Sequence, residues 1–254
     1  MNTTKLYKYL DINGGLMMLS HSNLQFTNAT KLNDPFDCHP SLINFSHVSE
    51  RLCKAWPSSI IESLEFDEYR RNREKTWICS LSKVYDSLLM WSYYNAHKGI
   101  CIGIDMDKAD KYLSRIYGPI MYGYTKLEVQ YKDIIDKPDY FQDKKDFIRY
   151  QLCTKAKDWE HEQEVRLIIL DPYPLYMALS PSQSKKGEPI DWKEVHAFPD
   201  IGGECFESIY LGVNINKEDK KAIIETSRKL NSNIKIYQMN IDPNAFRLNT
   251  ELTK

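Results

Sequence analysis

The stretch WEHEQEVRLII, from Trp159 to Ile169, joins a dense run of charges directly to an apolar segment. Charged side chains occupy alternate positions from Glu160 to Arg166, and Val165 and Leu167 have the opposite parity. Alternate residues of an extended chain point to the same face, so this pattern predicts a strand with one charged and one apolar face. An unpaired carboxylate is costly to bury, so these charges need partners or a function.

The same stretch also fits a plainer structure, in which a helix ends in solvated charges and an amphipathic strand follows. Glu164 and Arg166 would then form ion pairs with a neighbouring strand. These residues alone favour the plainer structure, but motifs elsewhere in the chain favour a functional role for the charges.

The sequence of 254 residues is long enough to bury a substantial core. We expect a single α+β domain over residues 1–254, with a helical insert near 48–75. A hydrophobic content of 42% and a charged content of 27% are ordinary for a globular protein. The net charge of -1 excludes a strong overall attraction to nucleic acids or acidic lipids.

Cysteine usage and apolar segments indicate the compartment. The six cysteines are scattered without a C-x-x-C pair, which favours a reducing compartment over a zinc site or a disulfide framework. The sequence after Met1 lacks the apolar segment of a signal peptide, and no run approaches membrane-spanning length. We therefore expect a cytoplasmic protein with no membrane partner.

Hydrophobic periodicity predicts strands and helices along the whole chain, and we expect a mixed, split β-sheet core with flanking helices. The clearest unit is a strand over 77–82, a helix over 87–97 that Asp86 caps and Gly99 follows, and a strand over 100–104. The Gly14-Gly15 pair is predicted to break the first strand. Further predicted elements are strands at 5–10, 24–26, 128–131, 208–213 and 234–237, helices at 106–116, 140–159 and 217–230, and a surface loop at 171–189.

A turn is predicted at Leu32-Asn33-Asp34-Pro35-Phe36-Asp37. Proline pushes the preceding residue out of the helical region, and Asx side chains bond the nearby backbone. Asn33, Asp34 and Asp37 either cap this turn or are available to line a cleft.

Five motifs follow one another along the chain: Leu6–Tyr9, the Leu32–Asp37 turn, Met90–Ile102, Trp159–Arg166 and Ile209–Gly212. In this order they resemble a bacterial family, the domain of unknown function 2971 (DUF2971), over nearly the whole chain. Some members of that family look like parts of anti-phage or toxin loci. The resemblance therefore implies a role in phage defence or as a toxin.

A second pattern consists of Lys8, Ser80-Leu81-Ser82 and Glu162-Gln163-Glu164, and it is similar to that of ADP-ribosyltransferases. Those enzymes carry a basic residue on an early strand, Ser or S-x-S on a middle strand, and an E-x-E or Q-x-E that ends in the catalytic glutamate. Lys8 departs from the pattern, because Arg or His is usual there. The resemblance implies an ADP-ribosyltransferase-like fold and NAD as a nucleotide substrate, with either glycohydrolysis or transfer to a macromolecule, protein or nucleic acid.

Cleavage of the bond between nicotinamide and ribose creates an oxocarbenium-like ribose, which a carboxylate beneath the sugar stabilises. We assign this role to Glu164, and we assign the orientation of the incoming nucleophile to Glu162. Arg166 would keep Glu164 ionised or bind a phosphate.

The remaining candidates would bind NAD. Lys8 would contact a phosphate or the adenosine ribose, and Ser80 would brace the pocket wall beside the other ribose. Tyr94 or Trp91 would stack on the nicotinamide. Tyr9 and Ser82 complete the cofactor-binding set, and the further cleft candidates are Asn33, Asp34, Asp37, His97 and Glu160.

These residues also have structural alternatives. Trp91 and Tyr94 fit core packing, and His97 fits a cation at the negative end of a helix. Lys8 fits a solvent-facing strand position, and the two serines fit the end of a strand.

Two other functions remain open. A metal-dependent nuclease would use Asp34, Asp37, Glu162 and Glu164 with divalent ions, although these acids lack a compact metal-binding spacing and no basic groove is evident. A non-enzymatic binding module would hold the acidic stretch in ion pairs with Arg70, Arg71 or Arg73. A buried salt bridge at Glu164 in the absence of a cleft would support the module.

Overall fold

The computed structural model describes residues 4–45, 54, 56–63, 69–118, 123–170 and 195–253, without the side chains of 61–63 and 69–71. The predicted loop at 171–189 and part of the predicted insert at 48–75 lie outside these residues. The described part of the insert contains two short helices, α3 (Ser58–Ser63) and α4 (Tyr69–Glu74).

In the described part of the chain, a mixed sheet of ten strands forms the centre of the fold, so the predicted α+β class with a mixed sheet flanked by helices is confirmed. The strands follow the order β12-β11-β10-β4-β1-β3-β2-β9, while β8 pairs with β3 and β5 pairs with β8. The β10–β11 pair is parallel, and the other pairs described in this sheet are antiparallel. The strands are β1 (Lys5–Leu10), β2 (Phe26–Asn28), β3 (Thr76–Ser82), β4 (Ile100–Asp105), β5 (Tyr124–Glu128), β8 (Glu164–Leu170), β9 (His196–Ala197), β10 (Phe206–Leu211), β11 (Lys235–Ile241) and β12 (Leu248–Leu252).

Helices cover the sheet and a small second sheet adjoins it. The second sheet pairs β6 (Gln130–Lys132) with β7 (Thr154–Ala156) in parallel. The longer helices are α1 (Ile12–His21), α5 (Leu88–Asn95), α6 (Met106–Tyr117), α7 (Phe147–Cys153) and α9 (Lys217–Leu230), and the short 3₁₀ helices are η1 (Ala29–Lys31), η2 (Pro40–Leu42), η4 (Lys157–Glu162) and η6 (Gly203–Cys205).

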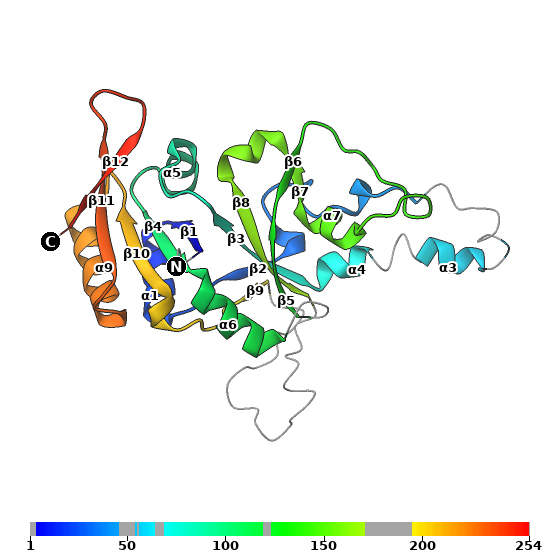
Figure 1. The fold of residues 1–254 in the computed structure, drawn as a ribbon, viewed down its shortest axis with the longest axis horizontal. Coiled ribbons are helices and arrows are strands. Elements are labelled where there is room, and N and C mark those ends of the chain that lie inside the picture. The colour runs from blue at the N-terminus through cyan, green and yellow to red at the C-terminus, as the bar shows by residue number, and fades with distance from the viewer. Residues whose placement is uncertain are drawn as a thin grey trace, which may run out of the picture.

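The main core lies between the sheet and the pair of helices α1 and α9, which pack against each other (Figure 1). Strand β4 contributes Ile100 and Ile102, β10 contributes Ile209, and α9 contributes Ile223, all of them fully buried. Burial of each such side chain stabilises the fold by about 1.5–3 kcal/mol.

The Gly14-Gly15 pair, predicted to break the first strand, lies inside α1, and β1 already ends at Leu10. Asp11 caps this helix by accepting a hydrogen bond from Gly14 N at 2.7 Å, which outweighs the low helix propensity of glycine. Gly15 is required by packing, because a Cβ at this position would lie 2.4 Å from Cδ1 of Ile100. Glycine here lets α1 approach β4 closely.

The helix predicted over 87–97 is α5, and both of its ends differ from the prediction. Ser87, not Asp86, is the N-cap, and the helix ends at Ala96 in a left-handed conformation with φ 49°. Gly99 does not cap the helix; a Cβ there would lie 2.1 Å from the carbonyl oxygen of Leu10. Close contact with β1 is therefore the reason for this glycine.

The single helix predicted over 140–159 is wrong. The chain forms only α7 as a regular helix in that range and then turns into β7 and η4. Ile148 is 36% exposed, whereas Leu152, four residues later, is buried. The pairing of β7 with β6 and the contacts of η4 override the helical periodicity.

The predicted strands correspond well to β1, β3, β4, β10 and β11. The strand predicted at 24–26 begins at Phe26, and the one predicted at 128–131 is divided between β5 and β6. The predicted helices at 106–116 and 217–230 are confirmed as α6 and α9.

The sheet opens between β1 and β3. These strands pair at one position, Tyr7 with Ser82, and then diverge. Strand β2 pairs with the other end of β3, through Thr27 and Ile78, while β8 follows β3 from Thr76 to Ser82. Around Ser80 the backbone of β3 therefore faces an opening between β1 and β2.

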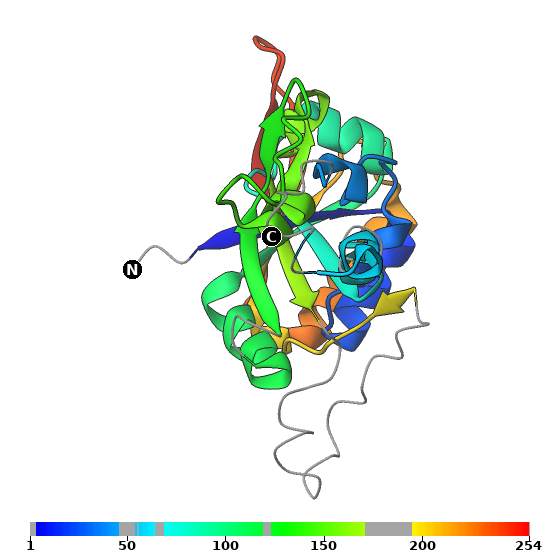
Figure 2. The same ribbon diagram turned by 90° about the vertical axis from the view of Figure 1, so that its right-hand side faces the viewer.

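The hairpin of β11 and β12 lies at one end of the long axis, and α3, α4 and α7 lie at the other (Figure 1). Figure 2 shows this hairpin extending beyond the body of the fold. Among the described residues, none of the helices is long and apolar enough to cross a membrane.

Candidate active site

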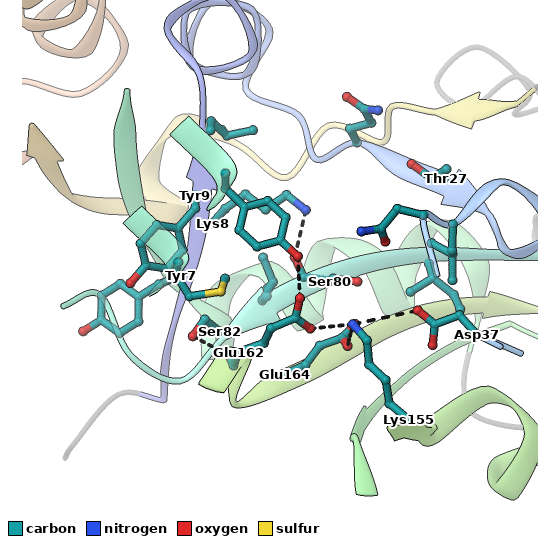
Figure 3. Close-up of a pocket in the computed structure, with 18 residues that line it drawn as sticks. Tyr7, Lys8, Tyr9, Thr27, Asp37, Ser80, Ser82, Lys155, Glu162 and Glu164 are labelled. Carbon is teal, nitrogen blue, oxygen red and sulfur yellow. Dashed lines mark hydrogen bonds and ion pairs between the residues drawn. The ribbon is translucent and has the colours of Figure 1, made fainter. Parts of the chain in front are cut away.

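A cleft of about 280 Å³ lies where β1, β2 and β3 diverge (Figure 3). Lys8, Ser80 and Glu164, which the sequence predicts to share a cleft, come from three different strands and line it together. Its other polar lining residues are Tyr7, Tyr9, Gln25, Thr27, Asn33, Asp37, Ser82, Tyr94, Lys155 and Glu162.

Glu164 begins β8 and is fixed by two cations. Its Oε1 accepts a hydrogen bond from Arg166 Nε at 2.8 Å, and its Oε2 accepts from Arg166 Nη2 at 3.1 Å and Lys155 Nζ at 3.2 Å. Burial by itself would raise the pKa of Glu164, but Arg166 and Lys155 outweigh it and lower the pKa to about 2. A hydrogen bond from Ser80 acts in the same direction. Glu164 is therefore an oriented carboxylate that is charged at neutral pH.

Glu162 reaches the same cleft, although it does not belong to a continuous strand. It is the last residue of η4, and Gln163 then adopts a left-handed conformation with φ 44° before β8 begins. The prediction of one extended charged face from Glu160 to Arg166 thus holds only from Glu164 onward. Glu162 Oε1 accepts a hydrogen bond from the Tyr94 hydroxyl, and Oε2 pairs with Lys155 Nζ at 2.5 Å.

Lys155 is a charged residue of the site that the sequence did not predict. It lies on β7, is 8% exposed, and places its ammonium group among Glu162, Glu164 and Asp37, the last at 3.8 Å. Burial opposes its charge, but the three carboxylates together raise its pKa. Lysines flank many turns, so no sequence pattern distinguishes this one; only the return of the chain from α7 through β7 brings it to the cleft.

Asp37 and Asp34 have different roles, although one turn carries both. Asp37 accepts a hydrogen bond from Arg166 Nη2 at 2.7 Å and is buried beside the cleft. Asp34 Oδ1 accepts from the backbone N–H of Phe36 at 2.9 Å, so Asp34 caps the turn and does not line the cleft. Asn33 is exposed at the cleft wall.

Lys8 and the two serines shape the opening in the sheet. Lys8 Nζ donates to the backbone carbonyl of Ser80 at 2.8 Å, across the gap between β1 and β3 (Figure 3). Ser82 Oγ donates to the backbone carbonyl of Glu162 at 2.7 Å and ties η4 to β3. Lys8 is thus directed into the cleft, and Ser82 has a structural contact.

Tyr94 lies over Glu162 at the edge of the cleft and is 40% exposed. Burial raises the pKa of its hydroxyl, and the neighbouring Glu162 raises it further. Tyr94 is therefore a neutral hydrogen-bond donor that partly covers one carboxylate oxygen.

Several other predicted site residues have structural contacts or lie away from the cleft. Trp91 is fully buried and donates to the carbonyl of Tyr85, so its core interpretation is correct and the stacking interpretation is wrong. Tyr9 forms part of the cleft wall, but its ring packs edge-to-face on Trp91. His97 lies beyond the end of α5 and Glu160 is exposed on η4; neither lines the cleft.

The nuclease hypothesis meets a specific obstacle. The ammonium group of Lys155 lies between the carboxylates that were considered as metal ligands, and Asp34 is turned to the backbone. In the described part of the chain, His, Cys, Asp and Glu do not gather in any group of three suited to a metal ion.

The binding-module hypothesis receives mixed evidence. Glu164 does form a buried salt bridge, but with Arg166 and Lys155, and a cleft is present beside it. Of the arginines considered as partners, Arg73 donates to the carbonyl of Ala29 at 3.3 Å. The side chains of Arg70 and Arg71 lie outside the described residues.

Part of the chain matches one known protein family. The family described as "Protein of unknown function (DUF2971)" matches residues 90–167, which begin in α5 and end in β8. This range includes the Met90–Ile102 and Trp159–Arg166 motifs, and the other three motifs lie outside it. None of the curated proteins and none of the solved structures compared matches the chain. Residues 90–167, the part of the chain that is similar to the DUF2971 family, supply Tyr94, Lys155, Glu162 and Glu164 to the cleft.

Proposed function

We propose that the chain is a NAD-consuming enzyme, an ADP-ribosyltransferase or NAD glycohydrolase, with an ADP-ribosyltransferase-like split sheet. The observation that supports this most strongly is the convergence of Lys8, Ser80 and Glu164, from β1, β3 and β8, on one cleft. A fixed anion, a hydroxyl and a separate cation suit a substrate with a cationic leaving group and phosphates.

The reaction breaks the bond between ribose C1′ and the nicotinamide nitrogen. The bonding electrons leave with nicotinamide, which becomes neutral, and positive charge develops on the ribose. Glu164, held ionised by Arg166 and Lys155, stabilises that charge from a fixed position. The nucleophile, either water or a group on a macromolecule, forms the new bond to C1′ and loses a proton.

We assign to Glu162 the orientation and deprotonation of this nucleophile. One of its oxygens is bound to Lys155, and the other accepts from the half-exposed Tyr94. Rotation of Tyr94 away from Glu162 would release that oxygen, so that it could orient the nucleophile and accept its proton. Tyr94 remains the candidate for stacking on the nicotinamide ring.

The test is nicotinamide release from NAD by the purified protein, measured by chromatography. Glu162→Gln keeps the size of the side chain and removes its capacity as a base, so we expect release to fall about 100- to 10,000-fold. Glu160→Gln is the matched control, because Glu160 belongs to the same stretch, is exposed and does not line the cleft. No release by the wild-type protein, or equal release by both variants, would reject the proposal. Transfer of label from NAD to a protein or nucleic acid would separate the transferase from the glycohydrolase.

A non-enzymatic binding module is the second candidate, since the carboxylates of Glu162, Glu164 and Asp37 all have cationic partners. A module of this kind would bind NAD or ADP-ribose in the cleft without releasing nicotinamide. Binding by calorimetry together with the absence of turnover would establish this alternative. For the enzyme, but not for the binding module, we also propose a cytoplasmic role in phage defence or as a toxin.

A further inference from the structure

A second hollow of about 410 Å³ adjoins the cleft and shares Leu10 and Gln25 with it. It lies between α1, the start of β2 and the segment that follows β9. The cleft alone, at about 280 Å³, lies just below the range of about 300–1,000 Å³ for small-molecule sites. The two hollows together lie well within that range.

The second hollow is chemically unlike the first. Its walls include Met17 and Phe198, which are 60% and 55% exposed, and the aliphatic side chain of Leu10. Large apolar side chains that are exposed together beside a hollow indicate a surface that binds a ligand or a partner. The polar groups at its edge are His21, Asn23 and Gln25, and the cleft's carboxylates do not line it.

We propose that this second hollow binds the adenine base of a dinucleotide whose nicotinamide half occupies the cleft. The inference rests on the proposed function and names the part of the substrate that the cleft is too small to hold. Phe198 offers a ring on which a base can stack, and the Met17 sulfur suits the edge or face of an aromatic ring. The side-chain amide of Asn23 carries the donor and acceptor that the adenine edge requires, while the amide nitrogen of Gln25 contacts His196 Nδ1 at 3.1 Å.

The position of Lys8 supports one ligand that spans both hollows. Lys8 and Leu10 are two residues apart on β1, so their side chains leave the strand on the same face. Leu10 borders both hollows, and Figure 3 shows Lys8 extending from β1 toward β2, which carries Thr27. A diphosphate that connects an adenosine in the second hollow to a ribose in the cleft would pass this ammonium group.

The test is calorimetric titration with two probes, ADP-ribose and nicotinamide mononucleotide. Phe198→Ala should weaken ADP-ribose binding about 5- to 100-fold, the range for loss of one stacked base. It should leave the affinity for nicotinamide mononucleotide unchanged, because that probe lacks adenine. Phe246→Ala is the matched control, since Phe246 is a fully exposed phenylalanine in the loop between β11 and β12. It should change neither affinity.

Three outcomes would overturn the inference: no binding of ADP-ribose to the wild-type protein, unchanged ADP-ribose affinity in Phe198→Ala, or an equal loss for both probes. These results are separate from the proposed reaction. If nicotinamide release persists while Phe198→Ala leaves ADP-ribose binding unchanged, only the second hollow is rejected. If ADP-ribose binding depends on Phe198 but nicotinamide release is absent, the subsite stands and the reaction is rejected.

Discussion

The buried ion pairs of Glu164 lead to a quantitative prediction for Glu164→Gln. The substitution keeps the shape of the side chain but removes the charge that faces Arg166 at 2.8 Å and Lys155 at 3.2 Å. Both cations are at least nine-tenths buried, so neither can turn to water without disrupting its surroundings. Asp37 then remains as the anion beside Arg166.

Two routes give a similar magnitude for the loss of stability. Removal of one partner from a buried ion pair costs about 3–5 kcal/mol. Independently, the fall in the pKa of Glu164 from an ordinary 4.5 to about 2 corresponds to about 3 kcal/mol of stabilisation at neutral pH. We therefore expect Glu164→Gln to lower the free energy of unfolding by about 3 kcal/mol or more at pH 7.

The assay is urea unfolding of the wild type and the variant at several pH values. A carboxyl with a lowered folded-state pKa stabilises the fold above its unfolded pKa, and this contribution is lost as the pH falls through the folded value. The difference between the proteins should be complete above about pH 5 and should shrink toward pH 2. A difference below about 1 kcal/mol at pH 7, or one that does not change between pH 5 and pH 2, would refute the reasoning. Glu160→Gln, at an exposed position, serves as the control.

Three further predictions concern other parts of the fold. Gly15→Val should destabilise the protein by about 1–3 kcal/mol in urea unfolding, because its Cβ would lie 2.4 Å from Ile100; an unchanged midpoint would contradict this close packing. Lys8→Met should raise the KM for NAD more than it lowers kcat, since Lys8 is proposed to contact a phosphate, and a purely kcat effect would argue against that contact. Tyr94→Phe removes the hydrogen bond to Glu162 from a half-exposed site, so unfolding should change by no more than about 1.5 kcal/mol while nicotinamide release changes measurably. Equal release by Tyr94→Phe and the wild type would show that this hydroxyl does not control the carboxylate.

Local sequence patterns predict the strands of this fold better than its helices. The apolar residues of β3 and β4 predict strands because these two strands are buried along nearly their whole length, and β1, β3 and β4 occur where expected. Gly15 of α1 and the short helix α7 depart from prediction because packing on β4 and the pairing of β7 with β6 outweigh local propensity. Such contacts cannot be read from neighbouring residues.

The sequence predicts the site residues whose side-chain direction follows from alternation along a strand. Glu164 and Arg166 were expected on one face of a strand, and they form a bidentate pair there. Glu162 reaches the cleft by a different route, through the left-handed Gln163. The sequence does not predict Lys155, because its position depends on the pairing of β7 with residues 130–132. Hydrophobic periodicity gives no sign of that pairing.

The most direct test of the proposed function is a crystal structure of the protein with a non-hydrolysable NAD analogue. The proposal predicts electron density for the ribose next to nicotinamide beside Glu164 and Ser80, with a phosphate within hydrogen-bond distance of Lys8 Nζ. A saturated crystal in which the cleft holds no analogue, or in which the analogue binds with its ribose away from Glu164, would contradict the proposal.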